Sequence, residues 1–512
     1  MKIAVLIIYF AVLVGIGFYC RKHATDVNGF VLAGRSVGPW LTAFAYGTSY
    51  FSAVVFVGYA GQFGWKYGIA ATWAGLGNAV IGSLLAWSIL GRRTRLMTQQ
   101  LDSATMPEFF GRRFASRPLK LFASVIIFIF LIPYTASLYN GLSRLFAMAF
   151  SIDYSVCIVL MAILTGIYVI AGGYMATAIN DFIQGIIMLV GIVAVICAVL
   201  ASQGGLMESL KGLAEISDPA VADFPGVFNS FLGPDPLNLL FVVILTSLGT
   251  WGLPQMVQKF YAIKDEHAIK KGTIISTLFA IVIAGGSYFL GGFGRLFSDK
   301  IDIAANGYDS VIPTMLSTLS PALIALVVIL VLSASMSTLS SLVIASSSTL
   351  TIDFLKETVA KKMDDRRQLL VIRAWIVVFI AISAVIALIQ YKSSVTFIAQ
   401  LMGISWGALA GAFLAPFLYS LYWRGTTKAA CTVSFIFGSC LMIWNMLFRS
   451  TLPAIIQSPI NCGVIAMLSG LVIVPVVSWF TGKPDKDLVD HAFSCYDRKA
   501  YVSVTTSLPD EE

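Results

Sequence analysis

Long apolar runs alternate along this chain with short polar segments. A helix needs about 20 mainly apolar residues to cross the hydrocarbon core of a bilayer. By this measure the pattern predicts about thirteen membrane helices, with no intervening segment long enough for a soluble domain. The expected ranges are 3–20, 40–63, 69–90, 120–148, 154–173, 180–201, 236–260, 272–296, 318–350, 369–390, 395–422, 429–448 and 461–481.

Composition agrees with this pattern. Of 512 residues, 58% are hydrophobic and 12% charged, whereas a soluble domain is about half apolar and about a quarter charged. The mean hydropathy is +0.85. We therefore expect an all-α polytopic protein of the cell membrane, with the lipid bilayer as its surroundings. The first apolar run has no small-residue cleavage site after it, so we expect an uncleaved span.

The positive charges predict the orientation. With the N-terminus outside, about 25 of the 34 Lys and Arg residues fall in segments on the inner side, as the positive-inside rule requires. We therefore expect the N-terminus outside and the C-terminus inside. The net charge of +8 follows from the same rule, so we expect no nucleic-acid partner. The tail over 482–512 is predicted to be cytoplasmic, and solvated apart from a short helix.

Two common metal-site motifs are missing from the sequence. It contains no CxxC and no HExxH, and its three histidines lie in polar segments. We therefore expect no catalytic residues and no organic cofactor.

Two predicted spans carry polar or helix-breaking residues near their middle. The second contains Thr48 and Ser52, and the seventh contains Gly249, Gly252 and Pro254. In the second, small residues suit either close helix packing or an unwound segment whose free carbonyls bind a cation. In the seventh, the proline predicts a break, with a simple kink as the alternative.

The ninth predicted span carries hydroxyls on one face. Ala334 lies three and four residues before Ser337 and Thr338, so one face presents a carbonyl beside two hydroxyls. Neutral oxygens suit a weakly bound Na⁺. The alternative is that both hydroxyls bond to carbonyls of their own helix.

An acidic residue lies near the inner end of the sixth span. Asp181 follows Asn180 there. It could serve an ion path or cap its helix, and the sequence leaves both interpretations open.

The two interrupted spans are five positions apart, and an odd offset places them in opposite orientations. Interrupted segments at matching positions are typical of inverted-repeat transporters. We therefore expect a transmembrane domain over 1–481, with repeats over about 40–201 and 236–422. Peripheral helices would lie at 3–20, 429–448 and 461–481.

Several stretches together resemble the sodium:solute symporter family, which includes proline, pantothenate, monocarboxylate and sugar symporters. They are 33–39, 171–174, 180–185, 254–260, 336–340 and 406–411. The resemblance implies a LeuT-type fold with five plus five core helices. It also implies a sodium site formed by the carbonyls of Thr48, Phe51 and Ala334 and the hydroxyls of Ser337 and Thr338. Asp181 and Arg35 match family residues on the sodium path or gate.

The resemblance is less specific about the solute. Proline symporters carry an Asp where this chain has Tyr50, and Trp and Tyr where it has Thr246 and Thr250. The candidates for solute contact are Tyr50, Ser52, Tyr134, Thr250, Trp251, Gly252 and Pro254.

The sequence thus predicts a monomeric, sodium-coupled symporter that imports a small organic solute by alternating access. The solute would be an amino acid such as proline, or a carboxylate such as pantothenate or a monocarboxylate. A transporter of a sugar or another polar solute is the alternative, followed by an ion channel.

Overall fold

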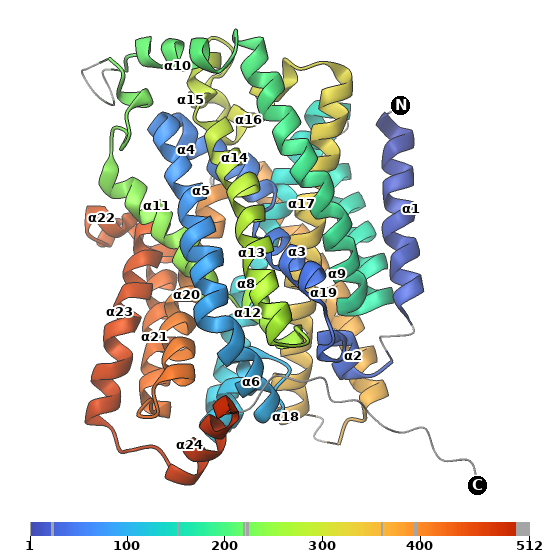
Figure 1. Cartoon of the computed structure of the whole chain (residues 1–512), viewed down its shortest axis with the longest axis vertical. Helices are drawn as coiled ribbons and strands as arrows, with labels where there is room; N and C mark the ends of the chain where they lie inside the picture. Colours follow the sequence, from blue (N-terminus) through green and yellow to red (C-terminus); the bar gives the residue numbers. More distant parts are fainter. Residues whose placement is uncertain are drawn as a thin grey trace.

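The fold is helical. The computed structural model describes residues 2–21, 25–150, 153–218, 221, 225–359, 362–393 and 398–497. Within these ranges the only β pairing is one isolated bridge between Val37 and Ile263, and helices fill the molecule (Figure 1). The predicted all-α class is confirmed.

Every predicted span coincides with a helix or with a chain of helical segments. In order, these are α1 (Lys2–Cys20); α3 (Pro39–Tyr50), η3 (Val54–Tyr59) and α4 (Ala60–Tyr67); α5 (Thr72–Gly77), η5 (Asn78–Leu85), η6 (Trp87–Gly91) and α6 (Arg92–Gln100); α8 (Arg117–Phe150); α9 (Tyr154–Ser202); α11 (Pro236–Leu248), η8 (Gly249–Gly252) and α12 (Pro254–Ala262); α13 (Glu266–Ala280), η9 (Ile281–Gly285) and α14 (Gly286–Gly291); α17 (Pro321–Ser348); α19 (Asp365–Ser393); α20 (Ile398–Tyr422); α21 (Lys428–Phe448); and α23 (Pro459–Phe480). Shorter helices on the surface or between spans include α2 (Val27–Leu32), η2 (Ala33–Arg35), α7 (Met106–Arg113), α10 (Leu206–Glu215), η10 (Gly294–Phe297), α16 (Val311–Ser317), η12 (Thr349–Leu355), α22 (Ala454–Gln457), α24 (Lys486–Phe493) and η14 (Ser494–Asp497).

In the described residues, nine helices are long and apolar enough to cross a membrane, or ten if one bent pair counts as a span. The difference from about thirteen arises partly because parts of the second and third predicted spans run together as Val54–Gln100, and partly because Ile7–Cys20 and Ser155–Ile167 are too short to qualify. The spans expected over 154–173 and 180–201 both lie in α9, which turns at Gly173 with φ 56°. The total number of spans and their orientation stay predictions. We call the side with α6 and α24 the predicted inner face, and the side with α10 the predicted outer face (Figure 1).

Burial separates the core from the periphery. In α20, 94% of the most apolar window is buried inside the protein, against 39% in α19 and α21. Helix α17 packs against α3, α8, α9 and α19, and α1 lies at the edge of the molecule (Figure 1). The hydroxyl-bearing helix α17 therefore runs through the interior, and α19 and α21 turn apolar side chains outward.

The C-terminal helix differs from the solvated tail that the sequence suggested. Helix α24 exists, but Val489, Ala492 and Phe493 are buried, and it packs against α6 and α7. Tyr496, just after it, donates from its hydroxyl to the carbonyl of Leu421 at 2.7 Å. The part of the tail after residue 497 lies outside the described residues.

Candidate functional site

The second predicted span is interrupted, as expected. Helix α3 ends at Tyr50, Phe51 is extended with φ −85° and ψ 116°, and helix resumes after Ser52. The Ser52 hydroxyl accepts from the Val54 amide at 3.2 Å, and Ser335 of α17 accepts from the Ala53 amide at 3.0 Å. These side chains satisfy amides that have lost their helical partners, so the break is stable within the protein.

The seventh predicted span is also interrupted. Leu253 is extended with φ −84° and ψ 122°, and the axes of the two helical halves differ by 48°. Pro254 occupies the first turn of α12, where its missing amide proton costs nothing. The sequence expectation of a full break holds, rather than that of a simple kink.

Oxygen atoms converge where the first break meets α17. The Ser337 hydroxyl lies 3.0 Å from the carbonyl oxygens of both Thr48 and Ala334. The Thr338 hydroxyl lies 3.0 Å from the Thr48 carbonyl, 3.1 Å from that of Ala334 and 3.4 Å from that of Phe51. Two hydroxyls can donate only two protons among these contacts, so five oxygens share one small volume with lone pairs to spare.

This oxygen cluster is neutral and buried. All five residues are at most 1% exposed. Among the described residues, no group of three or more His, Cys, Asp or Glu side chains is placed to hold a metal ion. Neutral carbonyl and hydroxyl oxygens suit a monovalent ion that must later leave, because a carboxylate would hold it more strongly.

Asp181 lies at the end of a polar chain that starts beside this cluster. Its carboxylate is buried and lies 3.8 Å from the Lys259 ammonium of α12. Lys259 donates to the Ser341 hydroxyl at 2.9 Å, and the Ser49 and Ser341 hydroxyls are 3.0 Å apart. Ser49 directly follows Thr48, and Ser341 lies one turn after Ser337. Asp181 thus pairs with a cation and does not cap the start of a helix, since α9 continues through it.

Sequence reasoning missed Lys259. The hydropathy pattern places Lys259 at the end of a predicted span, but its side chain is 2% exposed inside α12. The sequence feature that could have indicated a buried position is that Lys259 lies five residues after Pro254, on the short helix that follows the break.

Arg35 makes a different set of contacts. From its left-handed backbone conformation (φ 57°) it donates to the Thr98 hydroxyl and to three carbonyls, those of Thr98, Tyr261 and Ser103, at 2.6–3.2 Å. Burial lowers the pKa of its guanidinium, which nevertheless stays protonated. Arg35 joins the segment before α3 to the ends of α6 and α12 on the predicted inner face.

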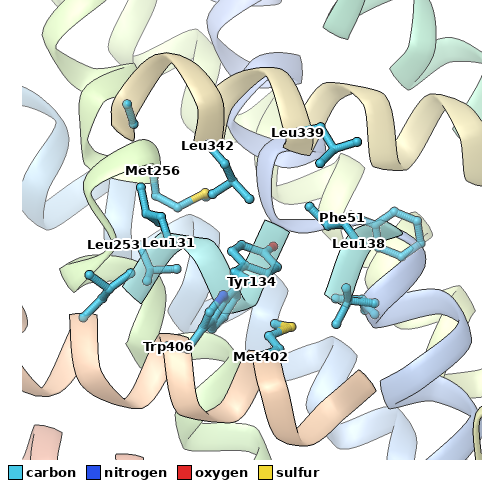
Figure 2. Close-up of a cluster of buried hydrophobic side chains, with 14 of the residues drawn as sticks. Phe51, Leu131, Tyr134, Leu138, Leu253, Met256, Leu339, Leu342, Met402 and Trp406 are labelled. Carbon is cyan, nitrogen blue, oxygen red and sulfur yellow. The ribbon is translucent and has the colours of Figure 1, made fainter. Parts of the chain in front are cut away.

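The solute candidates separate into two groups, and the first surrounds Tyr134. Its ring lies among side chains of α17 and α20, with Trp406 edge-on at 5.9 Å (Figure 2). Leu253 and Met256, from the second break and α12, point toward the same place. The Tyr134 hydroxyl faces Ser52 and Trp406, and neither contact has the geometry of a hydrogen bond. A buried hydroxyl without a protein partner is free to bind a solute.

The second group points elsewhere. Thr250 donates to the Ser247 carbonyl at 2.8 Å, and the Trp251 indole donates to the Ile81 carbonyl at 3.0 Å. A Cβ on Gly252 would lie 2.8 Å from the Ala410 backbone, so Gly252 serves close packing on α20. Pro254 begins α12. The backbone of Tyr50 ends α3, and its side chain lies outside the described structure. Leu253, which lies at this break, points toward the side chains around Tyr134 (Figure 2). Leu253 was not among the candidates for solute contact.

Two interrupted helices that meet an oxygen-bearing neighbour inside a polytopic bundle define a LeuT-type membrane transporter. The chain belongs to the sodium:solute symporter family, whose model matches residues 30–438. It is 28% identical over 486 residues to the osmoregulated proline transporter OpuE of Bacillus subtilis, covering 94% of each chain. It is 29% identical over 488 residues to a sodium/proline symporter of Staphylococcus aureus, covering 94% of this chain and 92% of that one.

A solved structure agrees with this fold. The substrate-bound, outward-open structure of a Na⁺-coupled sialic acid symporter superposes with a TM-score of 0.73 at 18% identity, over 95% of this chain and 99% of that one. This protein is therefore a multi-pass transporter of the cell membrane that couples Na⁺ to the symport of a small organic solute.

Proposed function

We propose that the coupling Na⁺ binds to the carbonyls of Thr48, Phe51 and Ala334 and the hydroxyls of Ser337 and Thr338. The supporting observation is the convergence of these five oxygens within 3.0–3.4 Å. Rotation of the two hydroxyl protons away from the carbonyls turns every oxygen lone pair toward the ion. The ion then ties α3 to α17 and favours the state in which both contact it.

The polar chain through Ser341 and Lys259 to Asp181 is proposed as the exit route. An ion leaving the five oxygens toward the predicted inner face meets Ser49 and Ser341 first. It then competes with the Lys259 ammonium for the Asp181 carboxylate. The membrane potential contributes about 2.3 kcal/mol per charge per 100 mV, which drives this direction of movement.

The solute is proposed to bind beside the ion, between Ser52, Tyr134, Trp406 and Leu253. This region has unpartnered hydrogen-bond groups on Tyr134 and Trp406 but no acidic side chain among the residues described around it. Donors without a carboxylate favour a carboxylate-bearing solute, such as pantothenate, a monocarboxylate or proline. A sugar symporter is the second candidate, because neutral donors also serve hydroxyl groups.

The proposal also covers the repeats, the oligomeric state, the cofactor requirement and the transport cycle. Residues 40–201 and 236–422 are the two repeats, the protein works as a monomer, and it needs no organic cofactor. Uptake is by alternating access, so flux saturates and requires both Na⁺ and solute, which distinguishes it from a channel.

The test is uptake into proteoliposomes by a Thr338→Ala variant. Loss of one ligand hydroxyl is expected to raise the Na⁺ concentration for half-maximal uptake about tenfold, equivalent to about 1.4 kcal/mol. Ser348→Ala is the matched control, because that hydroxyl on the same helix donates to its own helix carbonyl at Ile344. Equal Na⁺ dependence in wild type and Thr338→Ala would exclude the site.

A further inference from the structure

A large cavity opens on the predicted outer face, away from the two breaks. Its volume is about 910 Å³, and it lies between the end of α4, the segment before α11, η10 and the helices α22 and α23. Gln62, Lys66, Asp235, Asn238, Arg295 and Asn461 contribute its polar walls. By contrast, the cavity beside Pro254 toward the predicted inner face measures about 10 Å³.

Most polar groups in this cavity already have fixed partners. Arg295 donates to Asp218 at 2.9 Å and to the Trp65 carbonyl at 2.6 Å. Asp235 caps α11 by accepting from the amide of Asn238, at 3.1 Å, and from its side chain. Asn461 in turn donates to the Asn238 side chain at 2.6 Å. These contacts fix two walls of the cavity. The Arg295 charge is paired with Asp218, whereas the Asp235 carboxylate accepts hydrogen bonds but has no ion-pair partner among the described residues.

Lys66 is different. Its ammonium lies 5.1 Å from the centre of the Tyr308 ring, and it makes no ion pair with any residue in the described ranges. Gln62, one turn earlier, lines the same cavity, is 5% exposed, and has a side-chain oxygen without a hydrogen-bond partner. A partly desolvated ammonium beside an unsatisfied amide offers one positive charge and neutral hydrogen-bond groups.

The same helix face leads from this cavity toward the first break. Lys66, Gln62 and Tyr59 are spaced by four and three residues, so they lie along one face of the helix that begins after Ser52. The Tyr59 hydroxyl is buried and has no hydrogen-bond partner in the described structure. At about 1.5 Å per residue, Lys66 lies roughly 20 Å from Ser52. A small solute therefore cannot touch both at once, so the cavity is a separate site.

We propose that this cavity is a vestibule that binds the carboxylate of the incoming solute on the Lys66 ammonium before the solute reaches the breaks. The proposal rests on the sodium-coupled symport of a carboxylate-bearing solute argued above. Lys66 is the cation of this cavity that has no ion pair among the described residues. Because the Asp235 carboxylate lies in the same lining, the cavity suits a singly charged carboxylate better than a doubly charged phosphate. Capture here raises the local solute concentration at the entrance to the central site.

The experiment compares Lys66→Gln with wild type in proteoliposomes under an inward Na⁺ gradient. The labelled probes are L-proline, lactate, pantothenate and glucose. For the transported carboxylates we expect the KM to rise about three- to tenfold in Lys66→Gln, while the maximal rate and the half-saturating Na⁺ concentration stay unchanged. The difference should shrink in high salt, because added ions screen the ammonium.

Lys300→Gln is the control, because Lys300 is an exposed lysine in the loop just after η10, and so on the same face. An unchanged KM in Lys66→Gln, an equal effect of Lys300→Gln, or a lower maximal rate at constant KM would overturn the vestibule. Transport of glucose in place of every carboxylate would overturn it as well. The symport proposal fails by a different result, namely uptake that is independent of Na⁺ in wild type.

Discussion

At the scale of single residues, the site combines neutral oxygens with one buried ion pair. The five oxygens need no charge to attract a monovalent ion. Asp181 and Lys259, in contrast, each carry a charge into a region with almost no exposure, 0% and 2%. Such a pair gives little net stability, but loss of one partner leaves a buried charge uncompensated.

Asp181→Asn therefore tests the pair. We expect it to lower the free energy of unfolding by about 3–5 kcal/mol, since Lys259 is left as an unpaired buried cation. The double variant Asp181→Asn, Lys259→Gln should recover most of this loss. Thermal unfolding in detergent measures both. Asp364→Asn is the control, because its ion pair with Arg367 is exposed and should contribute less than about 1 kcal/mol. A double variant as unstable as the single one would contradict the pairing.

At the scale of helices, glycines set how closely the segments around the first break pack. A Cβ on Gly64 of α4 would lie 2.0 Å from the Gly291 carbonyl oxygen of α14. The Gly291 atoms cannot move aside as a flexible side chain could, because they belong to the backbone. This contact holds α4, and with it the row of Tyr59, Gln62 and Lys66, against α14.

Gly64→Ala is expected to destabilise the protein by about 1–3 kcal/mol, because α4 must separate from α14. Gly15→Ala in α1 is the matched control, since nothing lies within 4 Å of a Cβ there. That substitution should be neutral or slightly stabilising because alanine favours a helix. Melting temperatures of the two purified variants in one detergent give the comparison, and equal values would refute the close contact.

At the scale of the whole molecule, the two predicted faces differ in the size of the cavities that lie on them. The predicted outer face has a cavity of about 910 Å³, while the space among Met106, Gln258 and Ala345 on the other side is about 10 Å³. On this second side Arg35 joins the segment before α3 to α6 and α12. We propose that these hydrogen bonds keep the predicted inner face closed and break when it opens.

Arg35→Ala should shift the population toward a state open on that face. In a background without the seven native cysteines, an Ala345→Cys reporter should react slowly with a membrane-impermeant maleimide. Adding Arg35→Ala should raise the labelling rate several-fold, and Na⁺ should reduce it again. Labelling at the same rate with and without Arg35 would show that the arginine does not hold the closed state.

Sequence reasoning identified the helices, the interrupted spans and the oxygen-bearing face of Ala334, Ser337 and Thr338, whereas Thr48 and Phe51 followed from the family resemblance. It succeeded because span length, a proline in an apolar helix and hydroxyls at i, i+3 and i+4 spacing are local consequences of covalent structure and bilayer thickness. It did not find Lys259 or Leu253, and it placed Thr250 and Trp251 near the solute. The orientation of a side chain depends on the helix that packs against it, and here η5 accepts the hydrogen bond of Trp251.

The amino-acid sequence by itself thus determined which segments form apolar helices, where two of them fail to stay helical, and the family to which the chain belongs. Tertiary structure alone decided that Ser337 meets Thr48 across 289 positions of chain, that Asp181 has a cation as its neighbour, and that Lys66 faces a cavity. Hydropathy and backbone breaks act within about 20 residues, whereas ligand sets and ion pairs form between helices brought together by packing.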